Sequence, residues 1–129
     1  MAEALFRKMI ANHAAVKVAS AGLHAVEGRS ASPLAVVVLA KQGIDLSAFR
    51  SQPVTSELIK EATSVFAMTR DHLRQLLRLY PESQRKFFLL NAGSLDEDIP
   101  DPIGGSLQTY QECSETIQSA LQKIITTNV

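Results

Sequence analysis

One loop of the chain carries residue types that could perform acid–base chemistry. Asp101 is followed by Pro102, then by Gly104 and Gly105, and then by Ser106 at the start of a helical pattern. The proline restricts Asp101 to extended conformations, and the glycines permit a tight turn. The pattern therefore places a carboxylate on a stiff loop beside a helix N-terminus, an arrangement compatible with acid–base chemistry. Considered alone, an Asp-Pro pair more commonly marks an ordinary turn.

The other residues that could be reactive or bind a metal do not form a second group in the sequence. His13, His24 and His72 are scattered along the sequence and are expected to be structural or solvated. Cys113 lies inside the predicted last helix and is expected to be buried. A single cysteine excludes an internal disulfide and a multi-cysteine zinc site, and it fits a reducing compartment. The acidic run 96–98 is expected to be a solvated loop rather than a metal site.

Composition narrows the classes of partner. Thirteen basic residues balance 13 acidic ones, so the formal net charge is zero and electrostatics does not favour nucleic acid or an anionic membrane. No apolar run approaches the ~20 residues of a membrane span, and the N-terminus lacks the pattern of a secretory signal. With 129 residues, the chain is expected to form one domain over 1–129, located in the cytoplasm.

Apolar residues alternate between helical and strand spacing along the whole chain. Helices are predicted over 1–10, from Pro33 to the closing Gly43, over 55–62, over 69–79 and from 106 onward, and strands over 16–20, 64–68 and 87–90. This order predicts an α/β domain with a parallel sheet and helices on both faces. Such a domain normally opens with a strand, because a leading helix has no crossover to make. We therefore expect a further strand that would precede Met1.

Segments spread over the whole sequence resemble the low-molecular-weight protein phosphatases, a family that includes tyrosine phosphatases and bacterial protein-arginine phosphatases. Residues 1–6, Met-Ala-Glu-Ala-Leu-Phe, resemble the start of the family's first helix, and Ser-Ala-Gly at 20–22 resembles the end of its second strand. Residues 43–47 follow the second helix as in the family, and residues 98–106 resemble its general-acid loop. The resemblance implies a three-layer α/β/α fold with strand order 2-1-3-4.

The resemblance also implies a reaction. It makes Asp101 the general acid in phosphoryl transfer from a phosphoprotein to a cysteine and then to water, without a metal or organic cofactor. In the family, the first strand and a Cys-x5-Arg-Ser phosphate loop stand directly before the first helix, and neither occurs in these 129 residues. Cys113 does not fit the motif, because Ser119 stands six residues later. The chain is therefore expected to be N-terminally truncated and inactive.

The resemblance assigns pocket and supporting roles to five further positions. Ile103, Gly104 and Val26 are implied to line the substrate pocket, while Ser20 and Pro102 are implied to support the site. Tyrosine-specific members carry aromatic side chains at the positions of Val26 and Ile103, and aromatic stacking contributes ~0.5–1.5 kcal/mol per pair. The pocket therefore looks less suited to phosphotyrosine, and the Asp-Pro-x-Gly-Gly-Ser form resembles the arginine-phosphatase branch. Both substrates remain open.

Three functions of other classes share parts of this sequence pattern. The chain could be a catalytically inactive binding module that exposes a gap in its sheet to a strand-donating partner or to a second copy. An arsenate reductase would need relay cysteines, which a single Cys113 cannot supply. A receiver-like signalling domain shares the α/β alternation, but no acidic cluster follows a first strand.

Overall fold

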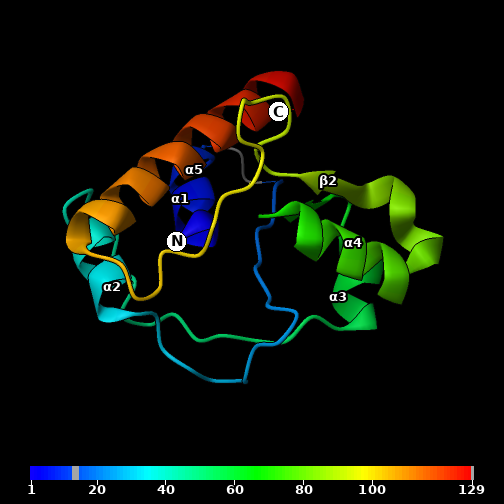
Figure 1. The fold of residues 1–129 in the computed structure, drawn as a ribbon, viewed down its shortest axis with the longest axis horizontal. Coiled ribbons are helices and arrows are strands. Elements are labelled where there is room, and N and C mark those ends of the chain that lie inside the picture. The colour runs from blue at the N-terminus through cyan, green and yellow to red at the C-terminus, as the bar shows by residue number, and fades with distance from the viewer. Residues whose placement is uncertain (13–14, 129) are drawn as a thin grey trace. The chain divides into compact units, whose positions relative to one another are not determined.

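The computed structural model describes residues 1–12 and 15–128 and forms an α/β structure (Figure 1). Its elements, in order, are α1 (Ala2–Met9), α2 (Pro33–Ala40), α3 (Ser56–Glu61), β1 (Val65–Ala67), α4 (Arg70–Leu79), the 3₁₀ helix η1 (Pro81–Lys86), β2 (Phe87–Leu89) and α5 (Leu107–Asn128). The strands pair in parallel with Val65 opposite Phe87. A parallel pair needs a crossover, and α4 with η1 supplies it. The predicted α/β class with a parallel sheet is confirmed; His13 lies outside the described residues.

Threonine caps fix the starts of α3 and α4, at the residues where the sequence predicted these helices to begin. Thr55 Oγ1 accepts the amide of Leu58 at 3.2 Å, and Thr69 Oγ1 accepts the amide of His72 at 3.1 Å. Each bond satisfies an amide that has no partner inside its helix. Because α4 begins directly after β1, the cap at Thr69 turns the chain from strand to helix at the end of the sheet.

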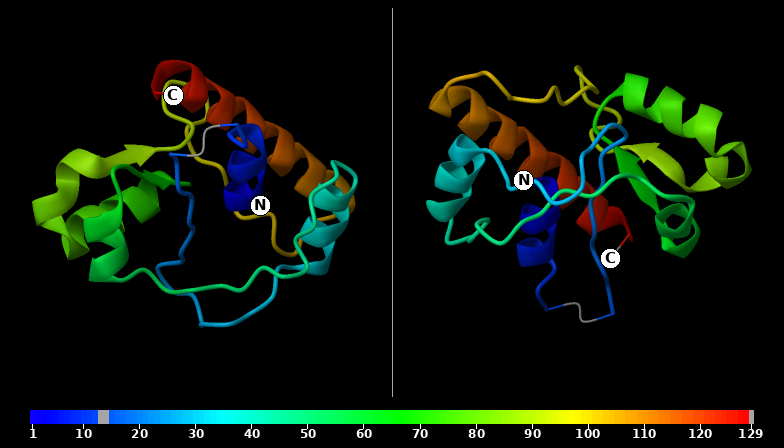
Figure 2. Two further views of the ribbon diagram at one scale, coloured as in Figure 1. Left: turned by 180° about the vertical axis from the view of Figure 1, so that it is seen from behind. Right: turned by 90° about the horizontal axis from the view of Figure 1, so that it is seen from below.

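The chain forms two compact units, and residues 1–53 and 101–129 make up the first. Within it, α1 and α2 both pack against α5, and Figure 2 shows α1 running beside α5. Buried apolar residues recur along α5 at helical spacing and form one apolar face, against which α1 and α2 pack. Its most buried apolar residues are Tyr110, Ile117, Ala120 and Leu121.

A polar cluster joins these three helices inside the first unit. Lys8 Nζ donates to the carbonyl of Gln42, which follows α2, and Gln42 Nε2 donates to Ser114 Oγ on α5 at 3.1 Å. Gln118 Nε2 donates to Gln42 Oε1. Ser114 is only 1% exposed, so its hydroxyl needs a partner inside the protein. Gln42 therefore acts as the hub that links α1, α2 and α5.

Residues 54–100 form the second unit, which contains both strands. Helix α4 packs on β1 and β2 and buries Leu76, while Phe87 is buried on β2. Phe66 and Phe88 are opposite each other in the ladder, and their rings lie 5.7 Å apart. Phe88 remains 46% exposed. The second unit is therefore a small βαβ element with one face covered by α4 and an aromatic pair at one ladder position.

The prediction of a strand over 16–20 was wrong. The segment 16–21 runs as an extended trace with no helix or strand assigned (Figure 1), and among the described residues the only pairing near it is an isolated bridge between Gly22 and Pro53. Side chains hold the segment instead: the guanidinium of Arg7 donates to the carbonyl of Val18 at 2.7 Å, and Gln52 Nε2 donates to the carbonyl of Ser20 at 2.9 Å. An alternating pattern specifies extended backbone, but a ladder also needs a neighbouring strand.

Candidate functional site

The loop that carries Asp101 is closed by two local hydrogen bonds. Asp101 Oδ1 accepts the amide of Ile103 at 3.0 Å, and the carbonyl of Pro102 accepts the amide of Gly105 at 2.9 Å. Gly104 has φ of +83°, the left-handed value that a type II turn needs at its third residue. An Asx turn therefore runs directly into a β-turn, and the carboxylate of Asp101 is held by the backbone of its own loop.

Gly105, the second glycine of the loop, is needed because neighbouring atoms leave no room for a Cβ, and not because of its φ angle. A Cβ at Gly105 would lie 2.8 Å from Thr109 Cγ2 and 2.9 Å from the carbonyl oxygen of Pro102. Thr109 lies in the first turn of α5, where its amide donates to Ser106 Oγ at 3.3 Å. Ser106 therefore caps α5, at the residue where the sequence predicted the last helix to begin. The turn containing Gly104 therefore packs closely against the first turn of α5, with Gly105 next to Thr109.

The charge of Asp101 acts on two neighbouring groups, the thiol of Cys113 and the amine of Met1, which is the N-cap residue of α1. Burial raises the pKa of the Cys113 thiol, the Met1 amine opposes this rise, and the charge of Asp101 adds to it. Burial lowers the pKa of the Met1 amine, while Cys113, Glu3 and Asp101 favour its charged form. Cys113 is only partly buried on α5, rather than buried as expected. Its raised pKa disfavours the thiolate that a nucleophile requires.

Ser20, the predicted supporting residue, lies in a charged network with α1. Ser20 Oγ donates to Glu3 Oε1 at 2.6 Å, and Arg7 forms an ion pair with Glu3 Oε2 at 3.0 Å. The Glu3 side chain is 18% exposed, against 59% for Arg7. The partly buried carboxylate of Glu3 therefore binds both Ser20 and Arg7, and the bond to Ser20 connects the end of the segment 16–21 to the first turn of α1.

The two predicted pocket walls are exposed on different loops of the first unit. Ile103 is 73% exposed in the loop 101–106 (the acid loop), and Val26 is 56% exposed. The carbonyl of Val26 accepts a hydrogen bond from Ser51 Oγ, and the amide of Gly28 donates to the carbonyl of Ser51 at 2.8 Å. Ile103 thus belongs to the same turn as Asp101, whereas Val26 belongs to a loop held by Ser51.

The acidic run 96–98 is more than a solvated loop. Glu97 Oε1 accepts a hydrogen bond from Arg70 Nη2 at 2.6 Å, and Glu97 Oε2 accepts the amide of Gly93 at 2.8 Å. Asp98 Oδ1 accepts the backbone amide of Arg70 at 2.8 Å. The bonds from Gly93 and Arg70 hold the pKa of Glu97 below its usual value. The run is therefore bound to the first turn of α4.

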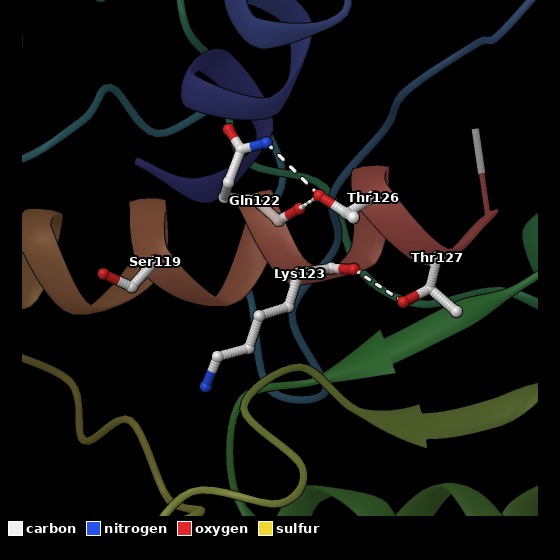
Figure 3. A pocket seen from close by; sticks show the side chains of 5 residues that line it. All are labelled: Ser119, Gln122, Lys123, Thr126 and Thr127. Carbon is white, nitrogen blue, oxygen red and sulfur yellow. Dashed lines mark hydrogen bonds between the residues drawn. The ribbon is translucent and has the colours of Figure 1, made fainter.

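A shallow groove along the C-terminal half of α5 is lined by residues of that helix alone (Figure 3). They are Ser119, Gln122, Lys123, Thr126 and Thr127. Thr126 Oγ1 and Thr127 Oγ1 donate to the carbonyls four residues earlier, so both hydroxyls serve the helix itself. Ser119 stands 13 residues beyond Ser106, which is about 20 Å along a helix. The groove is therefore separate from the acid loop.

The described residues offer neither a cluster of metal ligands nor a helix that could cross a membrane. Among residues 1–12 and 15–128, no group of three His, Cys, Asp or Glu side chains gathers as a metal site would require. In the same part of the chain, none of the helices has the length and apolar character needed to cross a bilayer. His72 belongs to the first turn of α4, where its amide is bound to the Thr69 cap.

Sequence reasoning missed the partners of Glu3 and Glu97. The i,i+4 spacing of Glu3 and Arg7 is visible in the sequence and indicates a pair on one face of α1. No local signal links Glu97 to Arg70, because 27 residues separate them. Such a pair follows only from the parallel βαβ arrangement, which brings the end of β1 and the loop after β2 to the same edge of the sheet.

Three kinds of comparison relate the chain to known proteins. The family model described as "Low molecular weight phosphotyrosine protein phosphatase" matches residues 1–128. A protein-arginine-phosphatase of Geobacillus stearothermophilus is 36% identical over 111 residues, covering 84% of this chain and 74% of the relative. A probable low molecular weight protein-tyrosine-phosphatase of Ralstonia nicotianae is 34% identical over 119 residues, covering 92% of this chain and 79% of the relative.

Solved structures give the same result. The low molecular weight protein tyrosine phosphatase of T. tengcongensis is 35% identical with a TM-score of 0.91, covering 98% of this chain and 88% of that chain. The arginine phosphatase of Geobacillus stearothermophilus is 34% identical with a TM-score of 0.87, covering 95% and 79%. A family match over almost every residue, with an α/β structure of the same type, shows that this chain belongs to the low-molecular-weight phosphotyrosine protein phosphatase family.

Proposed function

We propose that this chain provides the general-acid part of a phosphatase that hydrolyses phosphotyrosine or phosphoarginine in proteins through a cysteinyl phosphate. Asp101 protonates the leaving group and then activates water for the second step. The observation that carries this proposal is the Asp101 loop, whose carboxylate is held by the Ile103 amide beside the capped start of α5. A carboxylate fixed in this way contributes through general acid catalysis, typically ~10²–10⁴-fold. We place the reaction in the cytoplasm.

The pocket wall next to the acid favours a substrate without an aromatic ring. Ile103 is 73% exposed and offers an aliphatic surface where a phosphotyrosine ring would gain from stacking. Relatives named as arginine phosphatases and as tyrosine phosphatases both match this chain. We therefore propose a preference for phosphoarginine, measured as kcat/KM on peptides that differ only in the phosphorylated residue. Equal or higher kcat/KM on phosphotyrosine would contradict it.

The 129 residues are proposed to be inactive by themselves. An aspartate without a thiolate and an arginine clamp has no route to a phosphoenzyme, and Cys113 lies in a helix with a raised pKa. We expect no turnover of p-nitrophenyl phosphate above buffer. Robust turnover that disappears in Cys113→Ser would overturn this proposal and make Cys113 the nucleophile.

The acid itself is tested in a form of the protein that also carries a Cys-x5-Arg-Ser loop. Asp101→Asn should lower kcat by about 10²-fold or more on a substrate with a poor leaving group such as phenyl phosphate. The loss should be smaller with p-nitrophenyl phosphate, because a better leaving group needs less protonation. Asp96→Asn, in the loop before Ile99, is the matched control. Equal losses on both substrates would contradict the role of Asp101.

A binding module is the second candidate. The observation in its favour is the segment 16–21, which is extended and joins no ladder among the described residues. A strand from a partner or from a second copy could pair with it. Hydrogen exchange of amides 16–21 should slow when the protein is concentrated or when a strand peptide is added. A monomer whose exchange is unchanged under both conditions would count against this function.

A further inference from the structure

Ser51 binds the loop 26–29 through both its backbone and its side chain. The amide of Gly28 donates to the carbonyl of Ser51 at 2.8 Å, and the amide of Ser51 donates to the carbonyl of Arg29 at 2.8 Å. Ser51 Oγ donates to the carbonyl of Val26 and accepts the amide of Arg29 at 3.0 Å. A single residue therefore holds most of this loop, and all the groups involved belong to the first unit.

The hydroxyl of Ser51 makes two bonds that need opposite roles. A hydroxyl carries one donor and two acceptor lone pairs, so it can bind a carbonyl and an amide at the same time. An alanine at this position would bind neither group, whereas a threonine would retain the hydroxyl. Both partners are backbone groups, of Val26 and Arg29, so the hydroxyl constrains the main chain of the loop directly.

Val26 depends on this constraint because burial does not hold it. Val26 is 56% exposed, and its branched side chain has few rotamers, so the backbone largely sets where its methyl groups lie. The residues before it have separate support: the amide of Gly22 donates to the carbonyl of Gln52, and Gln52 Nε2 donates to the carbonyl of Ser20, both at 2.9 Å. Loss of the Ser51 hydroxyl should therefore loosen the chain at Val26 and leave the attachment at Gly22 intact.

We propose that Ser51 is a positioning residue for the substrate pocket: its hydroxyl holds the backbone at Val26, so that the Val26 side chain forms a wall of fixed position. Ser51 thereby affects which phosphorylated side chain fits, without touching the substrate itself. This inference rests on the phosphatase activity proposed above and on the pocket role of Val26. The bonds of the hydroxyl lie at the surface, so their loss acts locally and leaves the rest of the protein folded.

The first test measures the loop in the 129-residue chain by NMR. In Ser51→Ala we expect the ¹⁵N order parameter of Val26 to fall from about 0.85 to below ~0.6, and Ser51→Thr should restore it. Thr116→Ala is the matched control, because it also removes a hydroxyl that donates to a backbone carbonyl, that of Glu112 on α5. The order parameter of Val26 should not change in this control.

Two other amides show whether the effect stays in the loop. The amide of Gly22 should keep its order in Ser51→Ala, and so should the amide of Ile103, whose chemical shift reports the carboxylate of Asp101 to which it donates. A rigid Val26 in Ser51→Ala would contradict the inference, because the hydroxyl would then not hold the wall. Equal loss of order at Gly22 and Ile103 would contradict it as well, because the loosening would then be general.

A double-mutant cycle tests whether Ser51 acts through Val26. It uses the form of the protein that also carries a Cys-x5-Arg-Ser loop, with a phosphoarginine peptide as substrate. Ser51→Ala should raise KM by about 3–10-fold, the effect of one neutral hydrogen bond, and leave kcat nearly unchanged. In a Val26→Ala background the same substitution should have almost no effect, because the side chain that it positions is absent.

The inference and the proposed function can fail separately. Equal changes of KM in the two backgrounds, in an enzyme whose turnover depends on Asp101, would overturn the role of Ser51 alone. Turnover that does not depend on Asp101 would overturn the proposed function instead. The NMR test uses no activity, so it decides whether Ser51 holds Val26 in either case.

Discussion

Ser20 Oγ donates a 2.6 Å hydrogen bond to Glu3 Oε1, and this bond joins the extended segment 16–21 to the first turn of α1. Arg7 supports the same connection, since it pairs with Glu3 and also donates to the carbonyl of Val18. The segment therefore keeps its place in the first unit through side chains, where a strand would use a backbone ladder.

Removing the hydroxyl of Ser20 should weaken this connection. Ser20→Ala is expected to lower the free energy of unfolding by about 1–2 kcal/mol, because Glu3 loses one hydrogen bond to its charged group and is partly buried. Urea denaturation measures the effect. Thr116→Ala on α5 is the control, because that hydroxyl donates only to the carbonyl of Glu112 in its own helix and its loss should change stability by no more than ~0.5 kcal/mol. Equal effects of the two substitutions would show that the Ser20 bond is not stabilising.

The two glycines of the acid loop should respond differently to alanine. Gly104→Ala places a side chain at φ of +83° with nothing within 4 Å, so the cost is the left-handed conformation alone, about 1–2 kcal/mol. Gly105→Ala brings its Cβ within 2.9 Å of a backbone oxygen and should cost more, with displacement of the turn. Urea denaturation and the Ile103 amide shift measure both. Gly93→Ala, at φ of +86° in open space, should match Gly104→Ala in stability but leave the Ile103 shift unchanged.

The buried hydroxyl of Ser114 should be costly to remove. Ser114→Ala leaves the amide of Gln42 without its acceptor on α5. Because Gln42 is only partly buried, we expect the loss of this hydrogen bond to cost about 0.5–1.5 kcal/mol. The free energy of unfolding measures the loss. A double-mutant cycle with Gln42→Leu should be non-additive, since both substitutions break the same bond. Additive losses would show that the hub at Gln42 does not depend on Ser114.

Alkylation of Cys113 tests its neighbourhood with Asp101. Burial raises the pKa of the thiol, so the rate with iodoacetamide should reach half its limiting value at a higher pH than for an exposed cysteine. The charge of Asp101 adds to this rise. Removing that charge in Asp101→Asn should therefore lower the pKa and move the profile to lower pH. Asp96→Asn serves as the control. If the pH profile of alkylation moves equally in both variants, or does not move in Asp101→Asn, the charge of Asp101 does not act on the Cys113 thiol.

Elements with local signals were predictable from the sequence. The helices capped by Thr55 and Thr69 begin as expected, because a cap hydroxyl and its amide lie three residues apart. The same holds for the turn containing Gly104, whose glycine pair and proline specify the backbone directly. At Asp101 the local signal predicts only the turn, because its partner Ile103 is two residues away; the proposed role as an acid comes from the family resemblance.

Features that depend on distant partners could not be predicted in this way. The pattern of residues 16–20 shows an extended chain but not what lies beside it, so the expected ladder was wrong. The acidic residue Glu97 looked solvated because its cation, Arg70, belongs to the start of another element. In both cases the missing information is the spatial neighbour, which sequence periodicity does not contain.

The Asx turn at Asp101 makes the two oxygens of one carboxylate inequivalent. Because Oδ1 already accepts the Ile103 amide, the proton that the residue would carry belongs on Oδ2. Donation and later abstraction of a proton would then use the same atom along the same line, with no rotation of the side chain between the two half-reactions. A single backbone amide, two residues away, thereby assigns different tasks to the two oxygens of a symmetric carboxylate.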